Sequence, residues 1–223
     1  MAVHIQIKSI NEFSDKQYVE IFKSLGERRK ESVRYLANEN DKKRSIIAGY
    51  LIEKIADRFG CKKEDIKKTD KGKLFFALES APVFNVSHSG EYVILAYVPM
   101  RESLTAEIIQ DSNKMSMEVL LGVDIQKIRK LKQGMAKRIL NPKETMSEDQ
   151  LYLNRIWSAK EAYVKMTGSG LATDFRQLRV DFEAMICMDE EEERVGYLHE
   201  VNVGDKYFAY VCTSKCMDTY EIE

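Results

Sequence analysis

A long amphipathic segment that ends at Gly168 constrains the fold of this chain more than any other stretch. Ser147 and Gln150 have the spacing of a capping box, which predicts that a helix begins here. Gly168 supplies the stop that is typical of a helix C-terminus. At 3.6 residues per turn, one face of this helix is apolar and is expected to pack on the core. Its members are Ile156, Ala159, Tyr163 and Met166.

A second stripe on the same helix carries opposite charges one turn apart. Trp157, Glu161 and Lys165 follow one another at intervals of four residues, so all three project from one side. An exposed ion pair of this kind contributes only about 0.2–0.5 kcal/mol and occurs on many helices. On this spacing alone, Glu161 and Lys165 are either such an ion pair or the acid and the cation of a functional site.

The composition is that of an ordinary globular protein with one large domain or two small ones. The chain has 223 residues, 35 basic and 36 acidic, and a formal net charge of −1, which argues against general nucleic-acid binding. No apolar run approaches the length of a membrane span, and the four cysteines lack the spacing of a zinc site. We therefore expect a cytoplasmic protein with reduced cysteines that binds neither nucleic acid nor membranes.

Two segments of the first hundred residues offer groups that suit a phosphate. A helix is expected over residues 42–59, with Asp41 as its N-cap. Its basic first turn is either a solvated surface or an anion site where Arg44 meets a phosphate beside backbone N–H groups. Residues 84–97 have the pattern of a β-hairpin whose expected tip, residues 87–90, is either a polar turn or a phosphate-binding turn. A Ser–His hydrolase is disfavoured, because the sequence has no G-x-S-x-G elbow.

The strand expected over residues 121–126 carries polar side chains on one face. Period-two alternation places Asp124 and Gln126 together, opposite an apolar face. A carboxylate within an apolar strand is costly unless it is paired or bound to a metal. Either this face holds a metal ion, or the strand lies at a sheet edge with its polar face in water.

The order of the expected elements suggests a duplicated α+β unit. Each half has helices followed by antiparallel strands, and the later strands are expected over residues 176–182, 196–203 and 207–213. The irregular segment 99–117 is expected to be a boundary or a long loop between the halves. We therefore expect an N-terminal half, 1–117, and a C-terminal half, 118–223.

A local positive surface is expected just after the strand that carries Asp124. Residues 127–138 contain six basic side chains and no acidic one, in a chain that is nearly neutral as a whole. Such a surface is either simply solvated or suited to an acidic protein partner. The basic residues are Lys127, Arg129, Lys130, Lys132, Lys137 and Arg138.

Taken together, these side chains favour magnesium-dependent phosphoryl chemistry on a diphosphate. Asp124 and Glu161 supply carboxylates, while lysine, arginine, serine and histidine supply donors. Magnesium characteristically takes one or two carboxylates together with substrate phosphates and waters. We expect the metal and a lysine to neutralise charge, and a carboxylate to serve as base.

Three of these segments resemble the signature motifs of the 4'-phosphopantetheinyl transferases. They are the runs 84–90, 122–125 and 157–165, and their order and spacing agree over roughly residues 28–171. The resemblance is to the longer, monomeric type named after the surfactin synthetase activator, Sfp. It implies an α+β fold of two similar halves related by a pseudo-twofold axis, with antiparallel sheets and packed helices. Coenzyme A and magnesium would bind in the cleft between the halves.

The resemblance also implies a reaction and a set of site residues. A serine of an apo acyl- or peptidyl-carrier protein attacks the β-phosphate of coenzyme A, phosphopantetheine is transferred, and adenosine 3',5'-bisphosphate leaves. Asp124, Gln126 and Glu161 would hold magnesium, with Glu161 also the candidate base. Lys165 would stabilise charge on the diphosphate and the leaving group, and Asp124, Glu161 and Lys165 form the catalytic set. The expected ligands of coenzyme A, besides Lys165, are Lys73, Ser87, His88, Arg44 and Arg28 or Arg29.

Two departures from the family pattern stand out. The family often has glutamate at the position of Gln126, and the segment 99–117 is longer than the usual linker. The alternative from another class is a non-catalytic module that binds coenzyme A or a carrier protein, and Gln126 is the feature that supports it. Retention of Asp124, Glu161 and Lys165 argues against it, because binding alone would not need the full set. A magnesium-dependent nucleotide hydrolase and the shorter, trimeric holo-carrier-protein synthases are also disfavoured.

Overall fold

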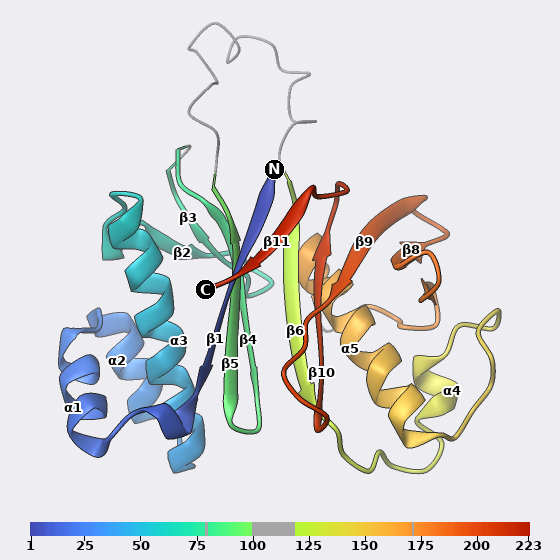
Figure 1. Ribbon diagram of the computed structural model, residues 1–223, viewed down its shortest axis with the longest axis horizontal. Helices are drawn as coiled ribbons and strands as arrows, with labels where there is room; N and C mark the ends of the chain where they lie inside the picture. Colours follow the sequence, from blue (N-terminus) through green and yellow to red (C-terminus); the bar gives the residue numbers. More distant parts are fainter. Residues whose placement is uncertain (79, 100–118, 171) are drawn as a thin grey trace, which may run out of the picture.

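Two α+β halves stand side by side in the computed structural model, each with helices on the outer face of a sheet (Figure 1). The structure describes residues 1–78, 80–99, 119–170 and 172–223. Apart from Pro99, the segment expected to be a boundary or loop lies outside these residues. The expected α+β class, with antiparallel sheets and packed helices, is confirmed. None of the described helices is both long enough and apolar enough to cross a membrane.

The first sheet has the strand order β11-β1-β5-β4. Its strands are β1 (Ala2–Ser9), β4 (Val83–Ser89), β5 (Tyr92–Val98) and β11 (Thr219–Ile222). Helix α3 (Glu39–Arg58) packs against this sheet, with α1 (Asp15–Ser24) and α2 (Glu27–Arg34) against α3. A small hairpin, β2 (Ile66–Lys68) with β3 (Leu74–Phe76), lies beside β4. Because β11 pairs in parallel with β1, the last strand of the chain belongs to the sheet of the first half.

The second sheet has the order β6-β10-β9-β8-β7, and all its neighbouring strands are antiparallel. The strands are β6 (Leu121–Lys127), β7 (Leu178–Asp181), β8 (Ile186–Asp189), β9 (Arg194–Glu200) and β10 (Tyr207–Thr213). Helix α5 (Gln150–Thr167) packs on this sheet, with the one-turn helix α4 (Ala136–Ile139) beside it. The apolar face expected for α5 is confirmed, since Ile156, Ala159, Tyr163 and Met166 are all buried.

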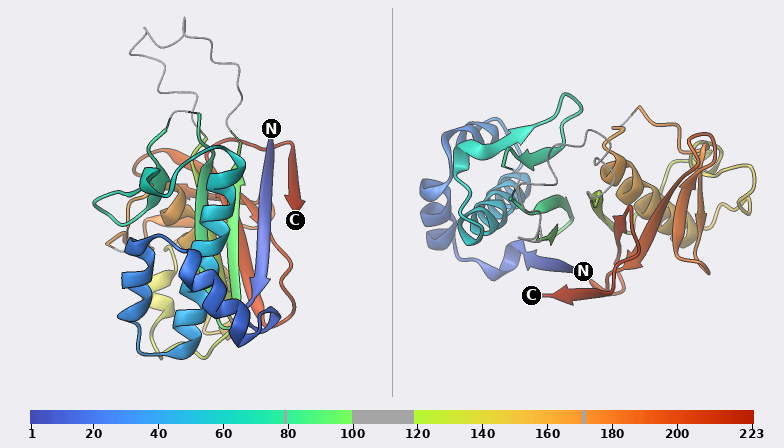
Figure 2. Two further views of the ribbon diagram at one scale, coloured as in Figure 1. Left: turned by 90° about the vertical axis from the view of Figure 1, so that its left-hand side faces the viewer. Right: turned by 90° about the horizontal axis from the view of Figure 1, so that it is seen from above.

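The two sheets share an apolar layer, so the molecule is layered as helices, sheet, sheet and helix. The view from above in Figure 2 shows α1–α3 outside one sheet and α5 outside the other. Side chains of β1 and β5 pack in this layer against side chains of β6 and β10. Among them are Val3, Ile5, Ile94, Val123, Ile125 and Val211. Separate clusters join α3 to the first sheet and α5 to the second.

The halves are also joined along β4 and β6, the edge strands of the two sheets. Backbone N–H groups of alternate β6 residues donate to side-chain oxygens of alternate β4 residues. We call this row of contacts the seam. Because the N–H groups of an edge strand have no backbone partner on that side, the seam supplies acceptors that they would otherwise lack. The contacts are Val123 to Asn85 Oδ1 (2.9 Å), Ile125 to Ser87 Oγ (3.4 Å) and Lys127 to Ser89 Oγ (3.0 Å).

Both expected helix starts were wrong by a few residues, for the same physical reason. In α3 the N-cap is Asn38 rather than Asp41, and the Asn38 side chain accepts from two backbone N–H groups of the first turn. In α5 the N-cap is Asp149 rather than Ser147, and Asp149 makes the equivalent contacts. Several residues near each start had side chains suited to capping, so the sequence did not determine which one would cap.

The earlier start of α3 changes the environment of its basic residues. Acidic Glu39 and Asp41 occupy the first turn, and Arg44 lies in the second turn. Of the two alternatives for this turn, the structure does not favour the anion site, because the Asn38 side chain already accepts from the N–H groups of Asn40 and Asp41. The hairpin of β4 and β5 is confirmed, but its tip is Gly90–Glu91, so Ser87 and His88 lie within β4.

Candidate active site

Strand β6 and helix α5 approach each other very closely at Gly122. A Cβ atom built at this position would lie 2.1 Å from the carbonyl oxygen of Ala162 and 2.2 Å from the backbone nitrogen of Met166. Glycine is therefore required for the strand to lie against the helix here. This approach brings the polar face of β6 onto the side of α5 that carries Lys165.

Asp124 is buried at this contact and is fully engaged with hydrogen-bond donors. Its Oδ1 accepts from Ser87 Oγ at 3.0 Å and from Lys165 Nζ at 2.6 Å. Its Oδ2 accepts from Ser158 Oγ at 3.0 Å. Although β6 is an edge strand, α5 covers its polar face, so the alternative in which this face lies in water is wrong: Asp124 is only 5% exposed.

Ser158 is a site residue that sequence reasoning missed. It precedes Lys165 by seven residues, which is two turns of helix, so both side chains project from one face of α5. That spacing was the signal that could have found it. Lys165 itself pairs with Asp124 on β6 and also donates to Ser87 at 2.8 Å. The interpretation of Lys165 as one half of an isolated pair on a helix surface therefore does not hold.

Asp124, Glu161 and Lys165 line one pocket, a cavity of about 380 Å³, which we call the pocket of Asp124. The pocket lining includes Arg29, His88, Asp124, Gln126, Glu161 and Lys165. Burial and the negative charge of Asp124 raise the pKa of Glu161, while the positive charge of Lys165 opposes that rise. Among the described residues, no hydrogen bond or ion pair holds the Glu161 carboxylate. Two carboxylates on one small pocket favour a bound cation, because the cation relieves their mutual repulsion.

The donor set of this pocket suits magnesium. Asp124 and Glu161 offer carboxylate oxygens and Gln126 offers an amide oxygen, all of them hard ligands. The Gln126 Nε2 group donates to the Lys127 carbonyl at 3.0 Å. The described residues contain no group of three or more His, Cys, Asp or Glu side chains that could hold a metal. A metal site made of Asp124, Glu161 and Gln126 is consistent with that finding, because glutamine is not one of those four residue types.

A second pocket, of about 690 Å³, adjoins the first, and its lining has an excess of basic over acidic side chains, the acidic ones being Glu27, Glu53 and Glu64. The two share Arg29 and Leu74 in their linings. The sequence pointed to either Arg28 or Arg29. Both line the second pocket, but of the two only Arg29 also lines the pocket of Asp124. The basic lining residues are Arg28, Arg29, Lys63, Lys67 and Lys68.

His88 lines the pocket of Asp124, and Arg44 lies close enough to act on the imidazole by its charge. Burial lowers the pKa of His88, and the positive charges of Arg44 and Lys165 lower it further, so the imidazole is neutral at pH 7. Arg44 pairs with Asp41 and donates to the carbonyl of Gly90. These contacts hold Arg44 at the turn between β4 and β5. Its expected contact with the nucleotide remains a prediction.

Lys73 makes contacts that the sequence did not indicate. Its ammonium donates to the carbonyl oxygens of Leu121 in β6 and Met166 in α5, both at 2.9 Å. Burial lowers the pKa of Lys73 to about 8. The side chain also lines a pocket of about 250 Å³ together with Glu161 and Lys165. Lys73 thus reaches from the first half to the second, and its expected role on a phosphate remains a prediction.

Comparisons with known proteins match both halves to one class of enzyme. The model of the 4'-phosphopantetheinyl transferase superfamily matches residues 120–210, and a model of a 4'-phosphopantetheinyl transferase N-terminal region matches residues 12–100. The chain therefore belongs to the 4'-phosphopantetheinyl transferase superfamily. Named Bacillus relatives confirm the Sfp type that the motifs indicated.

The similarity to these relatives extends over most of the chain. The 4'-phosphopantetheinyl transferase ffp of Bacillus subtilis is 24% identical over 84% of this chain and 81% of that protein. The transferase Sfp of Bacillus subtilis is 24% identical over 83% of this chain and 80% of its own. The human L-aminoadipate-semialdehyde dehydrogenase-phosphopantetheinyl transferase is 24% identical over 86% of this chain and 68% of the human protein.

Proposed function

We propose that the protein transfers the 4'-phosphopantetheine group of coenzyme A to a serine of an apo carrier protein. The observation that carries the proposal is the pocket in which Asp124, Glu161 and Lys165 meet, within a chain whose two halves both match this family. Magnesium is part of the proposal, because the oxygen ligands of Asp124, Glu161 and Gln126 suit it. We further propose that the protein acts as a monomer with internal pseudo-twofold symmetry, in the cytoplasm.

In the proposed reaction, Glu161 acts as the general base. Its raised pKa supports this role, because a carboxylate accepts a proton more readily as its pKa approaches the working pH. The carrier serine Oγ forms a bond to the β-phosphorus of coenzyme A, and its proton goes to Glu161. The bond from that phosphorus to the bridging oxygen breaks, and adenosine 3',5'-bisphosphate leaves with the electron pair.

The remaining residues of the pocket bind and orient. Lys165 stabilises charge on the diphosphate and the leaving group, while Asp124, held by Ser87 and Ser158, provides a fixed carboxylate. Asp124, Glu161 and Gln126 would hold magnesium, whose positive charge would offset that of the diphosphate. The adjoining pocket with Arg28 and Arg29 suits a phosphate at the nucleotide end of coenzyme A, because a guanidinium group can make bidentate hydrogen bonds to a phosphate.

Mass measurement of a carrier protein tests the proposal directly. The protein is incubated with an apo acyl- or peptidyl-carrier protein, coenzyme A and magnesium, and the carrier is then weighed. We expect a gain of one phosphopantetheine group, and no gain on a carrier whose acceptor serine is replaced by alanine. A carrier of unchanged mass, together with tight coenzyme A binding, would instead support a non-catalytic binding module. Chelation of magnesium is expected to abolish the gain.

A further inference from the structure

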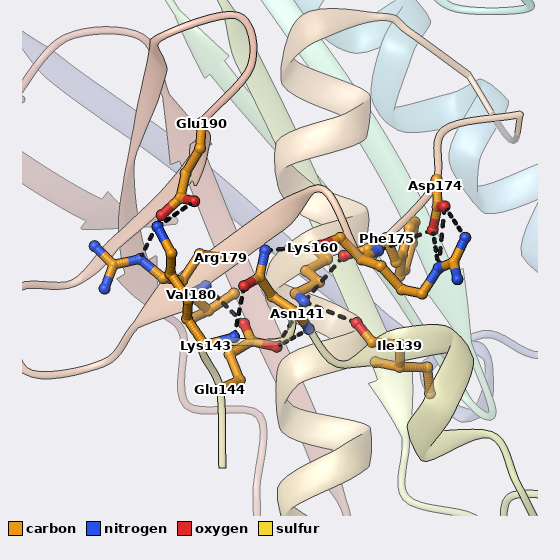
Figure 3. A network of polar contacts seen from close by, with 11 residues as sticks. Ile139, Asn141, Lys143, Glu144, Lys160, Asp174, Phe175, Arg179, Val180 and Glu190 are labelled. Carbon is orange, nitrogen blue, oxygen red and sulfur yellow. Dashed lines mark hydrogen bonds and ion pairs between the residues drawn. The ribbon is translucent and has the colours of Figure 1, made fainter. Parts of the chain in front are cut away.

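A fully buried lysine lies on α5 directly before the proposed base. Lys160 is 0% exposed, and its ammonium donates to three acceptors from three separate segments (Figure 3). These are the Ile139 carbonyl at 2.8 Å, the Phe175 carbonyl at 3.1 Å and Glu144 Oε2 at 2.8 Å. All three donor positions of an ammonium are therefore used. The proposed reaction gives Lys160 no role.

Its partner Glu144 is equally buried and extends the network. The Glu144 side chain is 3% exposed. Besides the lysine, its Oε2 accepts from the Asn141 backbone N–H at 2.7 Å, and its Oε1 accepts from the Val180 N–H at 2.8 Å. Asn141 in turn donates to the Arg176 carbonyl at 2.7 Å. The network thus ties α5 to the end of α4, to the loops before and after α5, and to β7.

A buried ion pair is a costly way to fill this space. Apolar side chains of similar volume often give equal or greater stability, so the pair is weak grounds for a purely stabilising role. Unlike apolar contacts, however, hydrogen bonds to an ammonium are directional. Three acceptors around Lys160 therefore fix the rotation of α5 about its axis and its position along that axis.

The position of α5 matters for Glu161 in particular. Asp124 is held by three side chains, whereas no hydrogen bond or ion pair among the described residues holds the Glu161 carboxylate. The distance between the two carboxylates therefore depends on where the backbone of α5 lies. Lys160 precedes Glu161 directly in that helix, and its three hydrogen bonds hold the backbone next to Glu161 to the end of α4 and to the loops on either side of α5.

We infer that Lys160 and Glu144 are positioning residues, whose ion pair holds α5 so that Glu161 stands at the correct distance from Asp124 for metal binding and proton transfer. This inference rests on the proposed function. Outer partners that orient the ligands of a metal typically change metal affinity or activity by about 10–100-fold when they are replaced.

The first test replaces both partners, because loss of one alone would leave a buried charge unpaired and destabilise the protein. The variant is Lys160→Met with Glu144→Gln. The matched control is Lys143→Met with Glu190→Gln, which removes a neighbouring ion pair of 2.7 Å whose lysine is 65% exposed. For the buried pair we expect a melting temperature close to that of the wild type, kcat lower by about tenfold or more, and weaker magnesium binding by calorimetry with coenzyme A present.

The second test uses the wild-type protein and does not depend on the folding of a variant. Coupling between two sites is reciprocal, so ligands that fix the carboxylates must also stabilise the network. Hydrogen exchange of the Asn141 and Val180 amides, which both donate to Glu144, reports on it. We expect magnesium with coenzyme A to slow their exchange by about fivefold or more.

The outcomes separate the inference from the function on which it rests. Wild-type protein that fails to modify any carrier would refute the transferase proposal itself. An active wild type, together with a folded double variant of unchanged kcat and magnesium affinity, would overturn the positioning role. If the double variant does not fold, unchanged exchange at Asn141 and Val180 on ligand binding overturns it as well.

Discussion

Lys165 combines a structural contact with the proposed chemistry. Its ammonium lies 2.6 Å from Asp124, while 29% of the side chain is exposed toward the pocket. A partly exposed ion pair contributes about 1 kcal/mol or less to stability. Asp124 also keeps two serine donors when the lysine is absent. Replacement of Lys165 can therefore lower the rate of transfer without unfolding the protein.

We predict that Lys165→Ala lowers kcat for phosphopantetheine transfer by about 10²–10³-fold and leaves the protein folded, because charge stabilisation in the transition state is worth more than a surface ion pair. Mass measurement of the carrier gives the rate, and circular dichroism gives the melting temperature. The control is Lys206→Ala, an exposed lysine of the second half. Near-normal transfer with a clearly lower melting temperature would show that Lys165 is structural.

Gln126 gives the pocket a neutral group where a carboxylate is usual in the family. Magnesium is therefore expected to bind weakly alone and well with coenzyme A, whose diphosphate supplies further oxygens. Gln126→Glu should tighten magnesium binding in the free protein and leave catalysis intact. Calorimetric titration with and without coenzyme A measures both effects, and Gln133→Glu, at an exposed position, matches the charge change. If Gln126→Glu binds magnesium no better than wild type, the metal ligands reduce to Asp124 and Glu161.

Glu161 should make the metal-free protein less stable at neutral pH. Its pKa is raised in the folded state, so the unfolded state loses this proton first as pH rises. The resulting loss of stability is complete above the folded pKa and absent well below the unfolded value of about 4.5. We predict that Glu161→Gln raises the free energy of unfolding at pH 7 without magnesium, and that this advantage vanishes by pH 3.5. Urea titrations across that range measure it, and an advantage independent of pH would contradict the argument.

Sequence reasoning at this scale succeeded where one element carries the signal. Alternation in β6 placed Asp124 and Gln126 on one face, and helical spacing placed Glu161 and Lys165 on one side of α5. Contacts between distant segments left no such signal. The carbonyl partners of Lys73 and the ion pair of Lys160 with Glu144 depend on how elements pack, and a single lysine or glutamate in the sequence does not indicate its partner.

At the scale of elements, residues 127–138 at the end of β6 and beyond it are rich in exposed basic side chains. All six basic residues of 127–138 are exposed, and Arg129 also lines the pocket of Asp124. A partner bound to this surface would therefore stand next to the pocket. Met146 and Leu151, which follow in the chain, add exposed apolar side chains, at 64% and 56% exposure. This arrangement supports the docking of an acidic carrier protein here.

We predict that Lys130→Glu with Lys137→Glu raises the KM for the carrier by about tenfold or more and hardly changes the KM for coenzyme A. Complementary charge acts mainly on the rate at which the carrier and the enzyme meet. Because salt screens such charges beyond about 10 Å at 0.1 M, the rate of the wild-type reaction should also fall as salt is added. Steady-state kinetics with each substrate varied separately provide the measurement. Lys16→Glu with Lys23→Glu, both exposed in α1, gives the same change in net charge. Equal losses toward both substrates would argue against a docking role.

Element boundaries show what composition and pattern could and could not predict. The existence of α3, α5 and the β4–β5 hairpin followed from periodicity and turn residues. The capping residues did not, because Asn38 competes with Asp41, and Asp149 with Ser147, for the same kind of contact. Strand β11 was not predicted either, since four residues that pair with the first strand of the chain have no local signal of their partner.

At the scale of the whole molecule, the halves are not independent units. Their sheets share one apolar layer, and β11 returns from the second half to pair with β1 of the first. Each half therefore buries part of its apolar surface only when the other is folded. That interdependence favours cooperative unfolding of the described structure as one unit.

We predict a single unfolding transition in urea. Trp157, the one tryptophan of the chain, reports on the second half through its fluorescence, and far-ultraviolet circular dichroism reports on both halves. The two curves are expected to coincide, with one midpoint. A midpoint for Trp157 fluorescence that differs from that of circular dichroism would show that the halves unfold separately.

The seam between β4 and β6 has a consequence for the assembly of the two halves. Its acceptors stand at every second residue of β4, and its donors at every second residue of β6. A slip by one residue would present Val86 in place of Asn85 or Ser87, and a valine side chain has no oxygen to accept an N–H. A slip by two would keep only two of the three acceptors within β4 and would carry Ser87 away from Asp124. The seam therefore fixes the register between β4 and β6. The halves can dock in that register only if Ser87 also reaches Asp124, so docking of the halves and assembly of the pocket of Asp124 occur together.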